Sequence, residues 1–178
     1  SNSSDALLLL RAGDAGVSTA MLPLLWVALH ASKMLSSLVG GDLSDRFGRK
    51  RLIFAGWILY ALVYAGFAFV DSAWQAWALF LLYGVYFGLT EGAEKALVAD
   101  LVPEEKRGTA YGLYNLAFGV TVFPASLLLG AIWSGASAQA AFLVSAALSV
   151  CAALFLLTVK TPAFSSPPPP NTDELRED

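Results

Sequence analysis

Long runs without any charged side chain alternate along this sequence with short segments that hold most of the charge. Residues 52–70 and 72–90 contain no Asp, Glu, Lys, Arg or His, and neither does the whole of 108–159. A helix that crosses roughly 30 Å of hydrocarbon needs about 20 apolar residues. The last run is too long for one helix, and the small and polar residues 134–139 predict a turn within it.

The pattern predicts five full membrane spans and one partial span. They cover residues 1–13 (partial), 18–41, 52–70, 74–100, 109–133 and 138–160. Soluble helices carry a polar face, and residues 52–70 have none. We therefore predict an all-α membrane protein, a helical transmembrane bundle surrounded by the lipid bilayer. A signal peptide is excluded because the apolar segments are too long and too many.

Composition agrees with this interpretation. Of the 178 residues, 57% are hydrophobic and 14% are charged, against about 45–50% and about 25% in a soluble domain. The net charge of -3 excludes a basic nucleic-acid binder. The single cysteine excludes an intramolecular disulfide and a cysteine-built zinc site. Nothing resembles a nucleophile–base pair, a metal-ligand cluster or a phosphate-binding loop, so we expect no enzyme, metal or cofactor.

Most of the basic residues fall on one side of the membrane if the spans alternate. Eight of the 11 lie there: Arg46, Arg49, Lys50, Arg51, Lys106, Arg107, Lys160 and Arg176. Lys and Arg concentrate in cytoplasmic loops. We therefore expect loops 41–51 and 101–108 and the C-terminus to be cytoplasmic, with Trp74, Trp77 and Trp133 near the outer interface.

The last residues, 161–178, differ from the rest. Residues 167–170 are a proline run, which favours extended polyproline geometry, and residues 171–178 are polar and mostly acidic. We expect a disordered, Pro-rich and acidic cytoplasmic tail. A partner that recognises the proline run is an alternative.

One segment resembles a family signature. It reads GDLSDRFGRKRLI from Gly41 to Ile53, and it resembles the GxLxDRxGRKxx pattern, followed by an aliphatic residue, of the major facilitator superfamily. The residues at its fixed positions are Gly41, Leu43, Asp45, Arg46, Gly48, Arg49 and Lys50. A second segment, from Asp100 to Asn115, is similar to the loop and helix start that follow the fourth or tenth helix of that family.

The resemblance implies the C-terminal half of a twelve-helix transporter, from the end of helix seven through helix twelve. It implies secondary active transport of a small solute by alternating access, with a proton gradient as driving force and efflux as one direction. It also implies a bacterial inner-membrane location. The chain lacks an initiator Met, so we expect an N-terminal six-helix half as a partner. The alternative is a non-transporting membrane module: a truncated fragment, a partner subunit or an anchor.

The signature segment predicts several local roles. Gly41 lets two helix ends approach closely, Gly48 permits a turn with positive φ, and Asp45 is placed to face a helix N-terminus. The resemblance implies that Asp45 latches the two halves together. We expect Arg46 to bridge to Asp100 or Glu104 near the next loop. The candidate gate charges there are Asp100, Glu104 and Arg107. A loop that only fixes topology is the alternative.

Ionisable groups within the predicted spans are candidates for coupling or substrate contact, because each costs about 2.5–3.5 kcal/mol on insertion scales. We place Glu91 and His30 first and Lys33 next, as a counter-charge to Glu91. Glu91 and Lys95 are four residues apart and can pair on one helix. A fixed ion pair between the two helices is the alternative.

Other polar residues of the spans rank below these. Asp5 and Asn115 are further candidates for substrate or proton coupling. Glu94 lies nearer the predicted inner interface, where we expect it to extend toward water.

Small residues predict how the helices pack. Gly84, Gly88 and Gly92 recur every four residues, which allows close contact with a neighbouring helix. Pro124 removes a backbone donor from its helix and predicts a kink.

Overall fold

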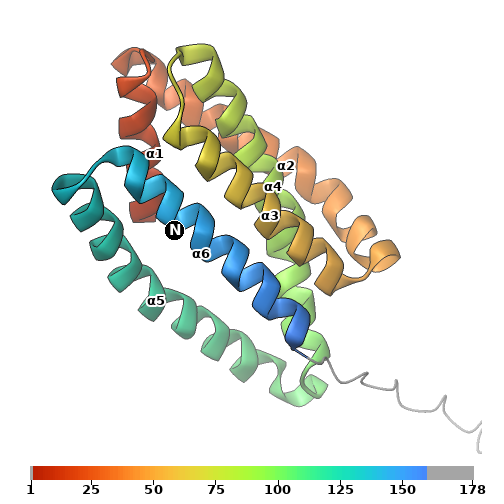
Figure 1. Cartoon of the computed structure of the whole chain (residues 1–178). Coiled ribbons are helices and arrows are strands. Elements are labelled where there is room, and N and C mark those ends of the chain that lie inside the picture. Colours follow the sequence, from red (N-terminus) through yellow and green to blue (C-terminus); the bar gives the residue numbers. More distant parts are fainter. Residues whose placement is uncertain (1, 160–178) are drawn as a thin grey trace, which may run out of the picture.

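The computed structural model describes the backbone of residues 2–159 and the side chains of residues 5–159. In this part the chain is all-α, which confirms the predicted fold class (Figure 1). The helices are α1 (Asn2–Asp14), α2 (Leu22–Phe47), α3 (Arg49–Ala68), α4 (Ala73–Asp100), α5 (Arg107–Gly135) and α6 (Ala138–Thr158). Short 3-10 turns, η1 (Thr19–Met21) and η2 (Glu104–Lys106), precede α2 and α5. The predicted tail, 161–178, lies outside the described residues.

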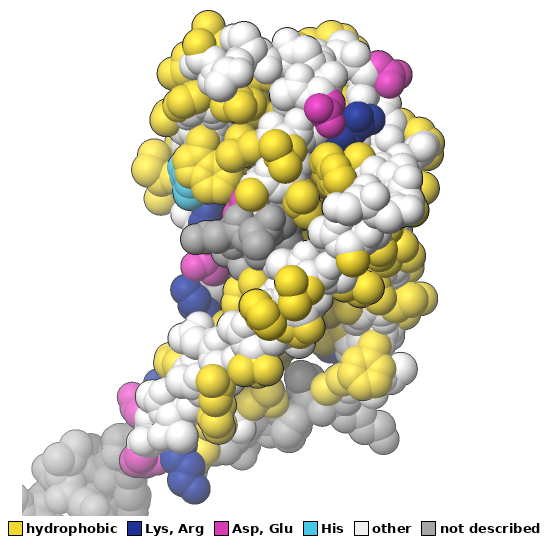
Figure 2. All heavy atoms as spheres, turned by 90° about the vertical axis from the view of Figure 1, so that its left-hand side faces the viewer, with side chains coloured by type: hydrophobic (Ala, Val, Ile, Leu, Met, Phe, Trp, Pro, Cys, Tyr) yellow, Lys and Arg dark blue, Asp and Glu magenta, His cyan; other side chains and the backbone are white. Residues whose placement is uncertain are grey.

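Several helices are suited to a hydrocarbon environment. Four stretches are long and apolar enough to cross a membrane: Thr19–Phe47, Arg49–Ala68, Glu104–Gly135 and Ala138–Thr158. Apolar side chains also cover much of the face in Figure 2, and Leu38 and Phe123 are 75% and 70% exposed. Lipid accommodates such side chains at no cost, so the chain forms a membrane bundle. α4 is not among the four stretches, and its span, 74–100, stays a prediction.

The helices follow one another in antiparallel order through short connections (Figure 1). In space α2 packs on α4, α4 on α3, α3 on α6, and α6 on α5. The α2–α3 junction, the segment between α4 and α5, and the end of α6 therefore meet at one end of the bundle. We call it the basic end, because Arg46, Arg49, Lys50, Arg51, Lys106 and Arg107 belong to it.

The α2–α3 junction is much shorter than the predicted loop 41–51. α2 continues to Phe47 and α3 begins at Arg49, so only Gly48 separates them. Its φ of 87° confirms the predicted left-handed turn, which a residue without a Cβ adopts at little cost. The rest of the segment stays helical because one such residue is enough to reverse the chain.

Glycines bring α2 and α4 into direct backbone contact. A Cβ at Gly84 would lie 2.6 Å from the carbonyl oxygen of Leu29, and one at Gly88 would lie 2.6 Å from that of Lys33. These distances leave no room for a side chain. They confirm the predicted close packing at both positions.

The glycine contact is narrower than the sequence predicted. Gly92 has no neighbour within 4 Å of a built Cβ, so it takes no part in the contact. Gly41 likewise has none, and the close approach expected there belongs to Gly40, whose Cβ would meet the carbonyl oxygen of Gly88 at 2.7 Å. The predictions for Gly41 and Gly92 were wrong because each residue points away from the helix–helix contact.

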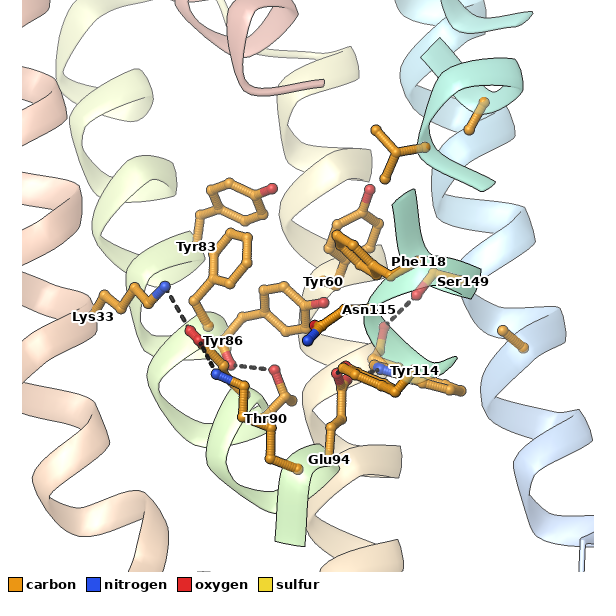
Figure 3. A pocket seen from close by; sticks show the side chains of 17 residues that line it. Lys33, Tyr60, Tyr83, Tyr86, Thr90, Glu94, Tyr114, Asn115, Phe118 and Ser149 are labelled. Atoms are coloured by element: carbon orange, nitrogen blue, oxygen red, sulfur yellow. Dashed lines mark hydrogen bonds and ion pairs between the residues drawn. The ribbon is translucent and has the colours of Figure 1, made fainter. Parts of the chain in front are cut away.

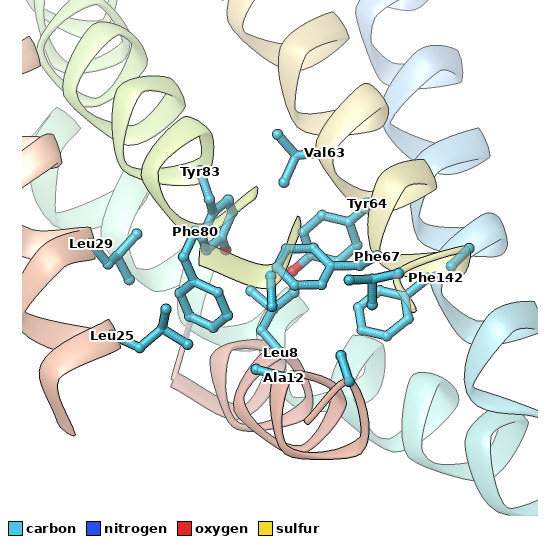
Figure 4. Close-up of a cluster of buried hydrophobic side chains, with 14 of the residues drawn as sticks. Leu8, Ala12, Leu25, Leu29, Val63, Tyr64, Phe67, Phe80, Tyr83 and Phe142 are labelled. Carbon is cyan, nitrogen blue, oxygen red and sulfur yellow. The ribbon is translucent and has the colours of Figure 1, made fainter. Parts of the chain in front are cut away.

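The core lies toward the end opposite the basic end, where α1 covers α3 and α4 (Figure 4). Phe67 and Phe80 meet edge to face with ring centroids 5.4 Å apart, and Phe67 stacks on Phe142 at 5.7 Å. Arg11 of α1 donates hydrogen bonds of 3.1 Å to the carbonyl oxygens of Phe67 and Val70. A basic side chain thus occupies the negative end of the α3 dipole.

α5 is the least buried of the long helices. Its only buried residue is Leu129, and the helix lies beside α6, away from α2 (Figure 1). It runs as one helix through Pro124, and the kink predicted there stays a prediction. Because α5 makes few close contacts with α4, space for a cavity is left between them.

Candidate functional site

A cavity of about 430 Å³ lies between α3, α4, α5 and α6, with α2 at its edge (Figure 3). Small-molecule sites typically measure about 300–1,000 Å³, so this one is large enough for a solute. Of the 17 residues that line it, seven are aromatic and four are charged. The lining residues are Lys33, Trp57, Tyr60, Tyr83, Tyr86, Phe87, Thr90, Glu91, Glu94, Lys95, Tyr114, Asn115, Phe118, Val122, Ala125, Ser149 and Ala152.

The sequence of α4 explains why this helix supplies so much of the wall. Residues three, four, seven and eight positions apart share one face of a helix. Tyr83, Tyr86, Phe87, Thr90, Glu91 and Glu94 follow this spacing. The first three form an aromatic surface, in which ring centroids lie 5.8 Å apart for Tyr83–Tyr86 and 4.9 Å apart for Tyr83–Phe87.

Glu94 is held inside the cavity by two neutral donors. The indole Nε1 of Trp57 on α3 donates to its Oε1 at 3.0 Å. The hydroxyl of Tyr114 on α5 donates to its Oε2 at 2.6 Å (Figure 3). Ser149 of α6 donates to the backbone oxygen of Trp57 at 2.8 Å. The Glu94 carboxylate of α4 therefore contacts α3 and α5 directly, and Ser149 connects α6 to its partner Trp57.

Glu94 lines the cavity, because its place on the same face as Tyr83, Phe87 and Thr90 directs it there. Its expected extension toward water at the inner interface stays a prediction. The partners of its carboxylate, Trp57 and Tyr114, were not predicted from the sequence. The helical spacing of Tyr83, Phe87, Thr90 and Glu94 was a signal that could have identified this residue.

Glu91 is held between two ammonium groups. Lys33 of α2 lies 2.6 Å from one of its oxygens, and Lys95 lies 2.9 Å from the other. The Lys33 ammonium also lies over the Phe87 ring, 4.9 Å from its centroid. Both pairings that the sequence predicted for Glu91 are present, and the one with Lys33 links α2 to α4 at the edge of the cavity.

The other candidates differ in position. Asn115 of α5 lines the cavity. Asp5 of α1 is buried, and it accepts a 3.0 Å hydrogen bond from the Tyr83 hydroxyl, so it contacts the aromatic wall from behind. His30 is exposed and does not line the cavity. Its ring packs edge to face on Trp26 at 5.2 Å.

The signature segment makes a different ion pair from the predicted one. Arg46 pairs with Asp42 one turn back on α2, at 3.0 Å, and not with Asp100 or Glu104. Asp100 instead pairs with Arg49, which also donates to the carbonyl oxygen of Ala96. Arg49 makes these contacts because it is the first residue of α3, directly beside the end of α4. The predicted Arg46 bridge was therefore wrong.

The remaining residues of the basic end have other partners. Lys50 donates to the carbonyl oxygens of Leu157 at 3.1 Å and Val159 at 2.5 Å, at the end of α6. Arg107 pairs with Glu104 on its own turn at 3.4 Å. Leu43 packs on the small cluster around Ile53. Asp45 is exposed, and no side chain caps the start of α3.

The sequence profile described as Major Facilitator Superfamily matches residues 6–177. An uncharacterised MFS-type transporter of Methanocaldococcus jannaschii is 40% identical over 123 residues, which are 69% of this chain and 31% of the relative. The uncharacterised MFS-type transporter YqjV of Bacillus subtilis is 29% identical over 164 residues, 91% of this chain and 40% of the relative.

A third relative has a functional name. The multi-drug resistance efflux pump PmrA of Streptococcus pneumoniae is 34% identical over 133 residues, which are 75% of this chain and 32% of that protein. The chain thus matches about a third of the length of these relatives.

Proposed function

This chain is a member of the major facilitator superfamily, and we propose that it forms the C-terminal half of a secondary transporter that moves a small solute by alternating access. The membership confirms the resemblance carried by the segment from Gly41 to Ile53. The cavity of about 430 Å³ is the observation that carries the proposal. Transporters of this kind bind their solute near the middle of the membrane, between two helical halves.

The second half of the site is proposed to come from six further helices of the same protein. The long helix α5 supports this, because Leu113, Leu116, Val120 and Phe123 on it are 62–70% exposed. α2 similarly exposes Met34, Leu35 and Leu38. These two apolar surfaces are suited to pack on other helices or on lipid. The basic end suggests a cytoplasmic location for the turns at Gly48 and 101–106 in a bacterial inner membrane.

We further propose that transport is proton-coupled and directed outward. The position of Glu91 at the cavity edge supports Glu91 over His30 as the coupling residue, since His30 does not line the cavity. The printed name of the pneumococcal relative supports efflux. The alternative is that the Lys33–Glu91 ion pair is fixed and only joins α2 to α4.

A transport assay on the full-length protein tests the proposal. The protein is reconstituted into liposomes, a pH gradient is imposed, and a panel of labelled solutes is followed. We expect gradient-driven movement of at least one solute, lost in Glu91→Gln and retained in His30→Gln. Movement that is unchanged in Glu91→Gln contradicts the coupling role. No movement of any solute favours the non-transporting membrane module.

A further inference from the structure

We propose that the cavity selects an organic cation, with Glu94 as its counter-charge and the surrounding rings as its aromatic cage. This inference rests on the proposed function, because it names the class of solute that the cavity takes. It follows from which charged groups of the lining form ion pairs and which one does not.

Two of the four charged groups, the ammonium groups of Lys33 and Lys95, are both paired with a third, the Glu91 carboxylate. Lys33 and Lys95 lie 2.6 and 2.9 Å from the two oxygens of Glu91. Glu94, one turn further along α4, has no basic side chain within 4.0 Å in the described part of the chain. Its two partners, Trp57 and Tyr114, are neutral. The carboxylate thus has hydrogen bonds and no opposite charge.

A solute that fills the cavity removes water from Glu94. An uncharged solute would leave the carboxylate desolvated with its charge uncompensated, which is unfavourable. An anion beside Glu94 would add repulsion to that cost. A cation would supply the opposite charge, and its pair with a well hydrogen-bonded carboxylate meets the condition under which a buried ion pair is favourable.

The aromatic wall favours the same class of ligand. The faces of Trp and Tyr rings carry negative electrostatic potential and attract cations within about 6 Å of the ring centre. Trp57, Tyr60, Tyr86 and Tyr114 line the same cavity as Glu94, and Figure 3 shows Tyr60, Tyr86 and Tyr114 there. At the edge, the Lys33 ammonium already lies 4.9 Å from the centre of Phe87. One aromatic ring of the wall thus already holds a cation, the ammonium group of Lys33, over its face.

The test uses three probes of matched size. Benzyltrimethylammonium is the cation, neopentylbenzene is its uncharged carbon isostere, and phenylacetate is the anion. Binding to the full-length protein in lipid nanodiscs is measured by calorimetry. We expect the cation to bind at least tenfold more tightly than either of the other probes. Equal affinity for the isostere, or no binding of the cation, overturns the proposal.

Variants assign the preference to a residue. Glu94→Gln keeps the shape of the side chain and removes its charge. We expect it to weaken cation binding at least tenfold and to leave isostere binding within twofold. The control Glu105→Gln makes the same change on the exposed turn η2 and should leave both affinities unchanged. An equal loss for both probes in Glu94→Gln indicates a packing role and overturns the proposal.

Two further variants guard against a folding defect in Glu94→Gln. Trp57→Phe and Tyr114→Phe each remove one neutral donor and keep both the ring and the carboxylate. We expect each to weaken cation binding, because the carboxylate loses one of its two hydrogen bonds, and to keep a preference for the cation over the isostere. Loss of that preference in both variants would show that the donors, and not the charge, select the ligand.

The failure of this inference can be told apart from the failure of the proposed function. Gradient-driven transport of an uncharged or anionic solute, unchanged in Glu94→Gln, would leave the proposed function standing and overturn the cation site. Cation binding that depends on Glu94, without transport of any solute, would support the cation site and overturn the proposed function.

Discussion

The ammonium group of Lys33 on α2 lies 2.6 Å from a carboxylate oxygen of Glu91 on α4. The backbone of Lys33 faces Gly88, where a Cβ would come within 2.6 Å of the Lys33 carbonyl oxygen. The absence of a side chain at Gly88 thus lets α2 approach α4, and the Lys33 side chain then reaches one turn further along α4. Close packing and the ion pair are two parts of the same contact.

Removing either charge should weaken this contact. We expect Lys33→Gln and Glu91→Gln each to lower the stability of the bundle, and the double variant Lys33→Gln, Glu91→Gln to lose less than the sum of the two single losses. Both side chains are about one third to two fifths exposed, so the coupling energy should be about 1 kcal/mol. A double-mutant cycle on thermal unfolding in detergent measures it. A coupling energy near zero would show that the pair contributes nothing.

Gly88 and Gly92 form a matched pair on one helix. Gly88→Ala should destabilise the protein by about 1–3 kcal/mol, because the added Cβ overlaps backbone atoms of α2. Gly92→Ala should be neutral or stabilising by up to about 1 kcal/mol, since Ala favours helix and nothing lies within 4 Å. Melting temperatures of the two variants provide the comparison. Equal melting temperatures would contradict the close α2–α4 contact.

Arg49 and Arg46 of the signature segment differ in what they contact. Arg49→Ala removes the Asp100 pair and the bond to the Ala96 carbonyl oxygen, and it should cost about 1.5 kcal/mol. Arg46→Ala removes only an exposed pair within α2 and should change stability by less than about 0.5 kcal/mol. Unfolding of both variants is the measurement.

The Asp100 partner can be checked independently. If Asp100 acts through Arg49, the effects of Asp100→Asn and Arg49→Ala on stability should not add, whereas those of Asp100→Asn and Arg46→Ala should. Transport by Asp100→Asn that equals the wild-type rate would show that this pair stabilises the basic end without acting as a gate.

Arg11 joins α1 to the end of α3. Arg11→Gln should lower stability by about 1.5–3 kcal/mol, because two carbonyl oxygens, those of Phe67 and Val70, lose a charged donor. Arg51→Gln, at an exposed position, is the control and should have almost no effect. Limited proteolysis of the turn after α3 offers a second readout, and unchanged cleavage in Arg11→Gln would contradict the capping role.

Much of the architecture followed from local properties of the sequence. Uncharged runs predicted the long helices, because a membrane-spanning segment must be apolar over its whole length. Gly48 predicted the sharp turn, since only glycine adopts that conformation readily. Glu91 and Lys95 predicted their own pair, as their spacing places them on one face of a helix. The segment around Asp45 and Arg46 identified the family, because its order of residues is specific.

Tertiary packing decided which of these residues meet. Asp100 pairs with Arg49 instead of Arg46 because the start of α3 lies beside the end of α4. Gly88 packs closely whereas Gly92 does not, since α2 and α4 are in contact over only part of their length. Glu94 enters the cavity because α3 and α5 supply donors from residues 37 positions before it and 20 after it. Spacing along one helix fixes a face, and only the arrangement of the other helices determines what that face contacts.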